Sequence, residues 1–333
     1  MKKILKVLAW LVVVVVVLAA GTYAWAYTTA KRAYERTWTA HNADFPIPFP
    51  LSDAELTALR TERVAAGAPA ADPLAGADLQ KAALDQATRR GQHLIASRLG
   101  CNGCHGDDFG GKELVNVSFV GYWAAPNITT GQGGVTKGFT AHDWDLAVRH
   151  GIKHTGTTSS MPSEEFQKMS DHELSDVVAY IQSKPPVNRE SKPVRLGPVF
   201  SFMLARNPNS FLAAQLDHQK PHAAEPPPPA VSVELGEHIV QVCRGCHGPT
   251  LSGGKIEGDP NMPIVGNITP HETGIKAWSE ADFLRALHEG KRPDGTELLP
   301  QMPWRAYGQM SDTELRAIYA YLRTVPPVAK GNR

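Results

Sequence analysis

The longest uninterrupted hydrophobic pattern of the chain lies at its N-terminus, where an apolar run without charged residues extends from Val7 to Ala26. At about 1.5 Å per residue, a helix of this length spans roughly 30 Å, the thickness of a bilayer core. Aromatic side chains lie near both ends of the run, at Trp10 and at Trp25, as in the interfacial belts of membrane helices. The pattern predicts a membrane-spanning helix over residues 1–30.

A cleaved signal peptide is the alternative interpretation of this segment. Residues 24–26 offer a small-x-small cleavage site, although the apolar run is longer than a usual signal-peptide core. In both cases the positive charges of Lys2, Lys3 and Lys6 keep the N-terminus in the cytoplasm. We therefore expect a protein anchored in the inner membrane with its folded part in the periplasm, or secreted to the periplasm if the segment is removed.

Downstream of this segment, one pattern of apolar positions occurs twice. Apolar residues at helical spacing follow Met-Ser-Asp-x-Glu in MPSEEFQKMSDHELSDVVAYIQSKPPV (161–187) and again in MPWRAYGQMSDTELRAIYAYLRTVPPV (302–328). The similarity continues over residues 91–187 and 236–328, with only short insertions between the two copies. The chain is therefore an internal duplication, and a function predicted for one copy can be checked in the other.

Alanine and proline mark the segments that connect the copies to each other and to the N-terminus. The stretch HAAEPPPPA before the second copy predicts a stiff, extended spacer. The stretch before the first copy is rich in Ala and Pro and contains one helical pattern. The predicted division is a membrane or signal segment at 1–30, a linker at 31–85, a first domain at 86–190, a proline-rich linker at 191–231 and a second domain at 232–333.

The charge of the chain is nearly balanced, with 34 Lys and Arg against 33 Asp and Glu and a formal net charge of +1 at pH 7. No basic or acidic surplus indicates nucleic acid or a polyanionic substrate as a partner. The function must therefore be identified from individual motifs rather than from overall charge.

The cysteines all belong to Cys-x-x-Cys-His motifs, one in each copy: Cys101, Cys104 and His105 in the first, and Cys243, Cys246 and His247 in the second. This spacing is typical of c-type haem attachment, in which both thiols bind the haem covalently and the histidine is the proximal iron ligand. A zinc site, a redox dithiol or a disulfide framework explains the repeated motif less well. We predict two covalently bound haem c cofactors, with His105 and His247 as metal ligands.

The second axial ligand decides what each haem can do, because a haem with two protein ligands mainly carries electrons. Met161 and Met302 each precede a proline, which keeps them out of a helix and in a loop from which a thioether can reach iron. Met169 and Met310 precede a capping-box pattern, Ser-Asp-x-Glu, and are placed to staple the following helix. Met262 also precedes a proline, but the first copy has no methionine at the matching position. We predict Met161 and Met302 as the axial ligands.

Two other polar patterns receive structural interpretations. Histidines of the first copy such as His150 and His154 have no consistent counterpart in the second copy and are interpreted as solvated surface residues. Asn-Ile-Thr at 127–129 and at 267–269 matches a glycosylation sequon, but its repetition close to each haem motif favours a structural role.

With these motifs in this order, each copy resembles a class I c-type cytochrome domain. The resemblance covers an N-terminal helix with Gly91 or Gly236, the Cys-x-x-Cys-His motif, the Asn-Ile-Thr segment, a Met-Pro loop and a C-terminal helix. It implies an all-α fold of two tandem class I cytochrome c domains with an N-terminal transmembrane helix. In such a fold, two helices cross near Gly91 and Tyr180 in the first copy, and near Gly236 and Tyr321 in the second.

The resemblance also implies a partner for the proximal histidine. The backbone carbonyl of Pro126 would hold His105 as a hydrogen-bond acceptor. Gly266 stands at the matching position of the second copy, and neither residue is included in the predicted ligand set. The predicted site is therefore limited to the cysteines, the two histidines and the two methionines named above, and contains no catalytic residue.

The sequence also resembles membrane-anchored bacterial cytochromes c and the cytochrome subunits of membrane-bound alcohol and gluconate dehydrogenases. We expect a carrier of single electrons in a periplasmic respiratory chain. Its redox partners would be a dehydrogenase or respiratory complex and a terminal oxidase or soluble cytochrome. The alternatives are a haem enzyme of the dihaem peroxidase or thiosulfate-oxidising type, and a subunit bound permanently to a dehydrogenase. The near-identical Met-Pro loops favour the carrier, since such enzymes make their two haem sites unequal.

Overall fold

The computed structural model describes residues 2–256 and 262–332. The chain forms two compact units, each of which combines separate parts of the sequence. The first unit contains Met1–Asn42, Gly103–Glu164 and Pro185–Lys220, and the second contains Ala43–Asn102, Glu165–Lys184 and Pro221–Arg333. Because the units are assembled from interleaved segments, the domain boundaries expected from the sequence stay a prediction.

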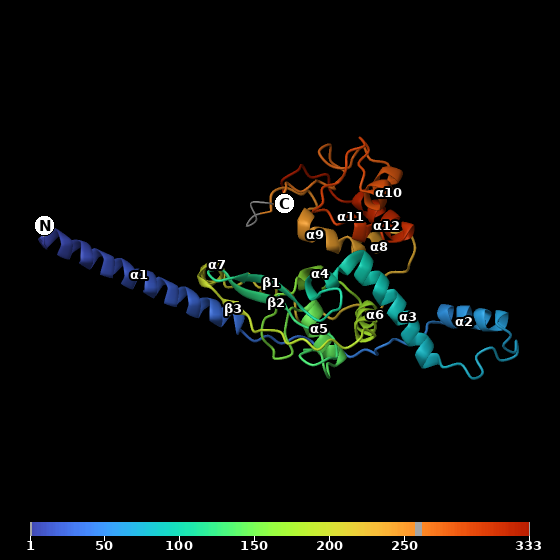
Figure 1. Ribbon diagram of the computed structural model, residues 1–333. Helices are drawn as coiled ribbons and strands as arrows, with labels where there is room; N and C mark the ends of the chain where they lie inside the picture. Colours follow the sequence, from blue (N-terminus) through green and yellow to red (C-terminus); the bar gives the residue numbers. More distant parts are fainter. Residues whose placement is uncertain (1, 257–261, 333) are drawn as a thin grey trace. The chain divides into compact units, whose positions relative to one another are not determined.

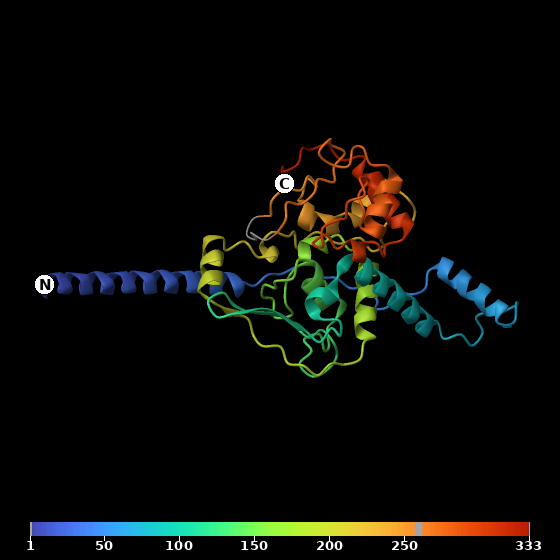
Figure 2. The ribbon, with the colours of Figure 1, turned by 45° about the horizontal axis from the view of Figure 1, so that its top comes forward.

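In the first unit, the N-terminal apolar run forms one long helix, α1 (Lys2–Tyr34) (Figure 1). Its most apolar stretch is not buried, and within the described residues it is the one helix long and apolar enough to cross a membrane. The last turns of α1 pack against α7 (Pro198–Arg206), where Ala30, Leu204 and Phe211 form a small buried cluster. Figure 1 and Figure 2 both show α7 beside this end of α1. The segment that follows the first copy thus holds the end of the apolar helix.

The first unit also contains a small antiparallel sheet that was not expected from the sequence. β1 (Lys112–Val117) pairs with β2 (Gly121–Ala125), and β2 pairs with β3 (Arg195–Leu196). Valine, tyrosine and tryptophan in these segments suit a pleated, half-buried surface. The nearby helices are α4 (Cys101–His105), α5 (Ala141–Arg149) and the one-turn 3-10 helices Ser163–Glu165 and Leu212–Ala214. Helices contain far more of the described residues than strands do, so the all-α class is confirmed, with this sheet as a local exception.

In the second unit, the first copy contributes the helices α3 (Leu79–Leu94) and α6 (Asp171–Gln182), which pack against each other (Figure 1). Glycine is required where they cross, because a Cβ atom on Gly91 would lie 2.0 Å from the carbonyl oxygen of Asp176 and 2.9 Å from Cβ of Tyr180. The expected crossing is therefore confirmed. The same unit also includes α2 (Asp53–Ala65) and a short π-helix, η1 (Ile95–Leu99).

The second copy repeats this crossing with α8 (Val233–Ile239) and α12 (Asp312–Leu322). A Cβ atom on Gly236 would lie 2.0 Å from the carbonyl oxygen of Ala317 and 2.7 Å from Cβ of Tyr321. The other helices of this copy are α9 (Gln241–His247), α10 (Glu280–Glu289) and α11 (Trp304–Tyr307). The apolar side chains of this copy form one core. Its fully buried members come mainly from the crossing helices α8 and α12 and include Ile239, Val240, Leu251, Leu315, Ile318 and Leu322.

Candidate functional site

The second copy contains a cavity of about 400 Å³. Its lining includes the predicted haem and metal ligands together with two further methionines: Cys243, Cys246, His247, Met302, Met262 and Met310. Much of the remaining wall is apolar and includes Trp278, Phe283, Leu299 and Tyr307. Cofactor sites typically enclose about 300–1,000 Å³ and are lined mainly by apolar side chains. Two thiols and an imidazole in such a wall are the donor set that a covalently attached haem requires, so these residues fit the predicted cofactor.

The proximal histidine of this cavity is held by a backbone carbonyl. Nδ1 of the buried His247 lies 2.8 Å from the carbonyl oxygen of Gly266. Nδ1–H donates to this oxygen, so Nε2 is the ring nitrogen that carries the lone pair a metal would bind, and the imidazole ring is fixed in orientation. The sequence interpretation left Gly266 out because it differs from Pro126. A backbone carbonyl can come from any residue, however, so that difference carried no information.

The first copy has the same arrangement on α4. Nδ1 of His105 donates to the carbonyl oxygen of Pro126 at 2.8 Å, which confirms the contact that the resemblance implied. Burial lowers the pKa of the His105 imidazole, and the hydrogen bond to Pro126 opposes this effect in part. The neutral imidazole that a metal binds is therefore favoured. None of the four cysteines, all of which lie in the described residues, forms a disulfide.

The Asn-Ile-Thr segments tie down the loops that supply these carbonyls. Asn127 follows Pro126 directly, and its side-chain oxygen accepts hydrogen bonds from the backbone N–H and the hydroxyl of Thr129 at 2.9 and 2.8 Å. Its amide group donates to the carbonyl oxygen of Val187 at 2.7 Å. Because Asn127 is fully buried, it is not accessible for glycosylation, and the structural interpretation is confirmed.

Asn267 makes the corresponding contacts in the second copy. Its side-chain oxygen accepts from the backbone N–H and the hydroxyl of Thr269 at 2.9 and 2.8 Å, and its amide donates to the carbonyl oxygen of Val328 at 2.8 Å. Val187 and Val328 both belong to the Pro-Pro-Val that ends the C-terminal helical segment of each copy. Each asparagine therefore links the loop beside the proximal histidine to the far end of its own domain.

Both Met-Pro loops share one tight turn. The backbone N–H of Ser163 donates to the carbonyl oxygen of Met161, and that of Trp304 donates to the carbonyl oxygen of Met302, each at 2.8 Å. A bond over two residues defines a γ-turn centred on the proline, and the dihedral angles of Pro303, φ −79° and ψ 49°, fit the inverse type. The turn holds each methionine outside a helix, as expected. Met302 lines the cavity, whereas the ligand roles of Met161 and Met302 stay predictions.

The other pair of methionines precedes helix caps, as predicted. Capping boxes between serine and glutamate begin α6, at Ser170, and α12, at Ser311. Met169 and Met310 are only 7% and 3% exposed, and Met310 belongs to the apolar core of its copy. Met310 also lines the cavity, so its burial has a packing explanation without excluding contact with the cofactor.

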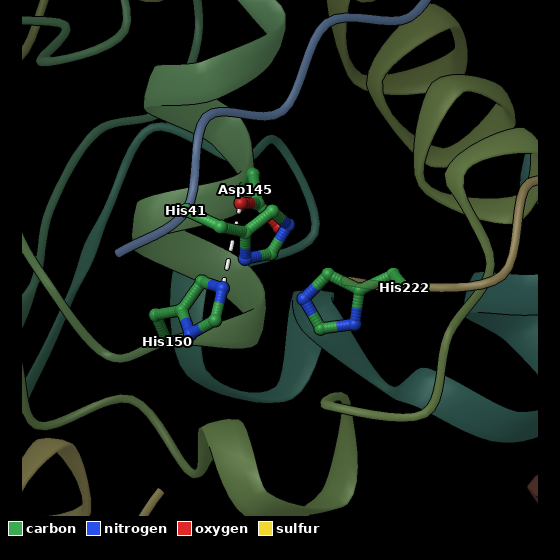
Figure 3. Close-up of side chains that lie close together, drawn as sticks. All are labelled: His41, Asp145, His150 and His222. Atoms are coloured by element: carbon green, nitrogen blue, oxygen red, sulfur yellow. Dashed lines mark ion pairs between the residues drawn. The ribbon is translucent and has the colours of Figure 1, made fainter. Parts of the chain in front are cut away.

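A buried polar cluster in the first unit is a second group of possible metal ligands. His41, Asp145 and His150 present nitrogen and oxygen atoms within 4.8 Å of one another, and Figure 3 shows Asp145 directed toward His150. The charge of Asp145 is already balanced, because its Oδ1 accepts a hydrogen bond from Nε of Arg149 at 2.6 Å and both side chains are fully buried. This pairing reduces the attraction of the cluster for a further cation.

The same cluster holds the segment that follows α7. Nδ1 of His150 lies 3.1 Å from Nδ1 of His218, and Nε2 of His218 donates to the carbonyl oxygen of Ala213 at 2.7 Å. The backbone of His41 also donates to the carbonyl oxygen of His218. His150 is fully buried, so its interpretation as a solvated surface residue was wrong. No pattern in the sequence indicated this burial, since the partner of His150 lies in a segment outside the repeat.

Comparison with protein families agrees with the geometry of both copies. Residues 86–181 match the family described as cytochrome c oxidase, cbb3-type, subunit III. Residues 233–326 match the family described as cytochrome c. These ranges contain one Cys-x-x-Cys-His motif each, and each ends within a few residues of the C-terminal helix of its copy.

Individual relatives are similar over different lengths. A diheme cytochrome c-type protein of Cereibacter sphaeroides is 27% identical over 262 residues, which is 69% of this chain and 83% of that protein. A nicotinate dehydrogenase subunit of Pseudomonas putida is 38% identical over 30% of this chain, and the fructose dehydrogenase cytochrome subunit of Gluconobacter japonicus is 37% identical over 29%. The matches span only 9% and 22% of these two relatives.

Fold, motifs and comparisons together define two class I cytochrome c domains in tandem. The chain belongs to the dihaem class I c-type cytochromes. Two haem c groups are attached covalently, through motifs that fit Cys101 and Cys104 in one domain and Cys243 and Cys246 in the other. The protein is accordingly an electron-transfer haem protein.

Proposed function

We propose that this cytochrome is anchored in the inner membrane and carries single electrons from a periplasmic dehydrogenase to a respiratory acceptor. The observation that carries the proposal is the equivalence of the two sites. In each copy, a carbonyl oxygen 2.8 Å from Nδ1 orients the proximal histidine, and a Met-Pro γ-turn presents a thioether from a loop. Two equivalent sites suit a carrier, because an enzyme needs at least one iron with an open position.

The side chains and turns of each site are suited to electron transfer. Haem iron with histidine and methionine as axial ligands exchanges single electrons without binding a substrate, and methionine raises its reduction potential relative to a second histidine. Met161 and Met302 are the residues we assign to this role. The tied loops of Asn127 and Asn267 limit movement of the proximal ligand when the charge on iron changes.

The N-terminal helix supports a location at the membrane. The uncharged stretch of α1 is exposed in the folded chain, while its end packs on α7 through Ala30. A retained helix would confine the protein to the membrane plane and raise the local concentration of membrane-bound partners. The names of several relatives, including alcohol dehydrogenase and gluconate 2-dehydrogenase cytochrome subunits, favour a dehydrogenase as the electron donor.

The test uses membranes that contain the full chain with both haems oxidised and oxygen excluded. An alcohol, a sugar acid or a ketose is added, and haem reduction is followed by absorbance. We expect one substrate class to reduce both haems. If none of them does so while a chemical reductant reduces both, a dehydrogenase of these substrate classes is refuted as the donor.

A matched variant tests the anchor. Residues 2–24 are replaced by a cleavable signal peptide, while Ala26 and Ala30 are kept because both are fully buried. We expect this variant in the soluble periplasmic fraction, with both haems attached and with slower reduction by the membrane-bound donor. Equal rates would show that the helix is not needed for donor access. Co-purification of the full chain with a dehydrogenase in mild detergent would identify it as a permanent subunit.

A further inference from the structure

The duplication places a histidine and a glutamate at matching positions of both copies. His93 and His238 each lie two residues after the glycine of the helix crossing. Glu173 and Glu314 each lie at the third position of the C-terminal helix and close its capping box. All four residues belong to the second compact unit.

These residues pair across the copies rather than within them. Nε2 of His93 lies 2.8 Å from Oε2 of Glu314, and Nε2 of His238 lies 2.8 Å from Oε2 of Glu173. In both pairs, the contacted oxygen is the one that accepts the capping hydrogen bonds from serine. Each copy thus offers its histidine to the other and receives the other's histidine in return. Such reciprocity is the pattern of an isologous two-fold interface, here formed within one chain.

Arg98 lies between the two pairs and has no counterpart in the second copy. Its side chain is 10% exposed, with Nη2 at 3.1 Å from Oε1 of Glu173 and Nε at 3.7 Å from Oε1 of Glu314. Arg98 belongs to η1, the π-helical segment that makes the first copy longer between its glycine and its haem motif. A π-helical turn is a usual way to accommodate an insertion, and it is often associated with function.

Both glutamates are ionised in this contact. Burial alone would raise the pKa of Glu173, but the hydrogen bond from His238 and the charge of Arg98 lower it to about 2. Burial likewise opposes ionisation of Glu314, while the hydrogen bond from His93 and the charge of Arg98 lower its pKa to about 2. In each case a histidine of the other copy helps to hold the carboxylate in its charged form, so each anion is stabilised in the arrangement in which both copies are in contact.

Apolar side chains surround the ion pairs. Leu94, Leu99 and Met169 of the first copy and Ile239 and Val242 of the second line a narrow cavity of about 30 Å³ together with Arg98, Glu173 and His238. A cavity of this size has room for only a few water molecules, so little space separates the two surfaces beside the charges. Met169 directly precedes Ser170, the cap residue of the helix α6 that contains Glu173. Because Met169 is buried, it connects the contact between the copies to the core of the first domain.

We propose that the reciprocal His93–Glu314 and His238–Glu173 pairs, joined by Arg98, lock the two cytochrome domains in one orientation and so position their haems for electron exchange. The rate of electron transfer falls steeply with distance, and an ion-pair contact supplies directional constraints that an apolar surface alone does not. The five residues are positioning residues, because none of them belongs to the predicted ligand set. The kinetic part of this inference rests on the proposed carrier function, whereas the contact itself does not.

The test compares the full-length oxidised protein with the variant His93→Ala/Arg98→Met/His238→Ala. Pulsed electron paramagnetic resonance measures the distribution of distances between the two ferric ions. We expect one narrow distribution in the unaltered chain, and in the variant a distribution broader by about twofold or more with unchanged absorption spectra of both haems. The control Arg89→Met, which replaces an exposed arginine of α3, should leave the distribution unchanged. A variant distribution as narrow as that of the unaltered chain would overturn the proposal.

If the triple variant does not accumulate, a double-mutant cycle of His238→Ala and Glu173→Gln tests whether these two side chains interact. Glutamine keeps the capping box and removes the charge. We expect the two substitutions to be coupled by at least about threefold in the unfolding equilibrium constant. Additive effects would refute the pairing.

Photochemical reduction of one haem then measures transfer to the other. We expect the broadened variant to be slower by about tenfold or more, since productive transfer depends on fixed geometry. Equal rates in both proteins would refute the positioning role alone. No transfer in the unaltered chain would refute the carrier function while leaving the distance measurement to judge the contact.

Discussion

The two cytochrome domains position their predicted haem ligands in the same way and differ in the structure around each haem site. In both, a carbonyl holds the proximal histidine at 2.8 Å, a buried asparagine ties down that carbonyl, and a methionine precedes a proline in a γ-turn. The first domain adds η1, a three-stranded sheet and the buried ion pair of Asp145 and Arg149. The residues near iron therefore remained alike after duplication, while the additions serve contacts with other parts of the chain.

The largest expected effect comes from the axial methionines. Met161→Ala and Met302→Ala should each convert one haem per chain from the low-spin to a high-spin or open form, because the thioether is lost. Met262 lines the same cavity as Met302, so the variant Met262→Ala/Met302→Ala tests whether it substitutes; we expect no further change. Absorption and electron paramagnetic resonance spectra measure the spin state of each haem in the single and the double variants.

The capped methionines are the matched controls for this experiment. Met169→Ala and Met310→Ala should each lower the free energy of unfolding by about 2–5 kcal/mol, as truncation of a buried methionine does, and keep both haems low-spin. Loss of low-spin signal in Met169→Ala, with a normal spectrum in Met161→Ala, would reverse the assignment.

The next effect concerns the helix crossings. Gly91→Ala and Gly236→Ala each place a Cβ atom 2.0 Å from a carbonyl oxygen, so the helices must separate. We expect each to destabilise its domain by about 3 kcal/mol or more, at the upper end of overpacking effects. Thermal unfolding followed by haem absorbance measures the loss. A much smaller loss in one copy would show that its crossing can relax and that the two domains are less alike than described.

A smaller effect depends on pH. The pKa values of Glu173 and Glu314 are lowered from 4.5 to about 2, so each carboxylate stabilises the folded chain fully above pH 4.5 and loses this contribution as the pH falls toward 2. The contribution of each is at most about 3 kcal/mol. Urea unfolding between pH 2 and 7 should show the decline.

Glutamine variants sharpen this comparison. Glu173→Gln and Glu314→Gln should each remove a similar part of the pH dependence, because the pKa of each carboxylate is lowered to about 2. If both variants keep the pH dependence of the unaltered chain, another group is responsible.

The smallest expected effect is at the asparagines. Asn127→Ala and Asn267→Ala each remove the side-chain hydrogen bonds that link the histidine loop to Val187 or Val328, and we expect a loss of about 1–3 kcal/mol in each domain. The reduction potential of the same domain should shift as well, since the loop that orients the proximal histidine is loosened. A loss of stability confined to the first domain would show that the asparagine hydrogen bonds stabilise only the domain that contains the three-stranded sheet.

Much of each haem site could be predicted from the sequence because its parts are local. The spacing of Cys243, Cys246 and His247 is one helical turn, and the capping boxes at Ser170 and Ser311 lie within four residues. The duplication then separated the loop methionines from the capped ones. Composition and length were enough to predict the helix α1, because an uncharged apolar run of that length is typical of a membrane span or a signal peptide.

The remaining features depend on contacts between distant segments. Gly266 was identified at the position that matches Pro126 but was left out of the predicted site, because a backbone acceptor leaves no mark in the side-chain pattern. His150 was placed at the surface because its partner, His218, lies outside the repeat. The pairing of His238 with Glu173 was also missed, although a signal existed: the equal spacing of His93 and His238 from their glycines could have suggested a shared role.

Titration of the fully reduced, full-length protein with carbon monoxide at neutral pH tests the equivalence of the two haem sites most directly, because this ligand binds only where iron has an open position. We expect no uptake at either haem of the unaltered chain, and uptake at one haem per chain in Met161→Ala or Met302→Ala. Uptake at one iron per chain in the unaltered protein would contradict this equivalence, because the two sites would then be unequal and one of them open for chemistry.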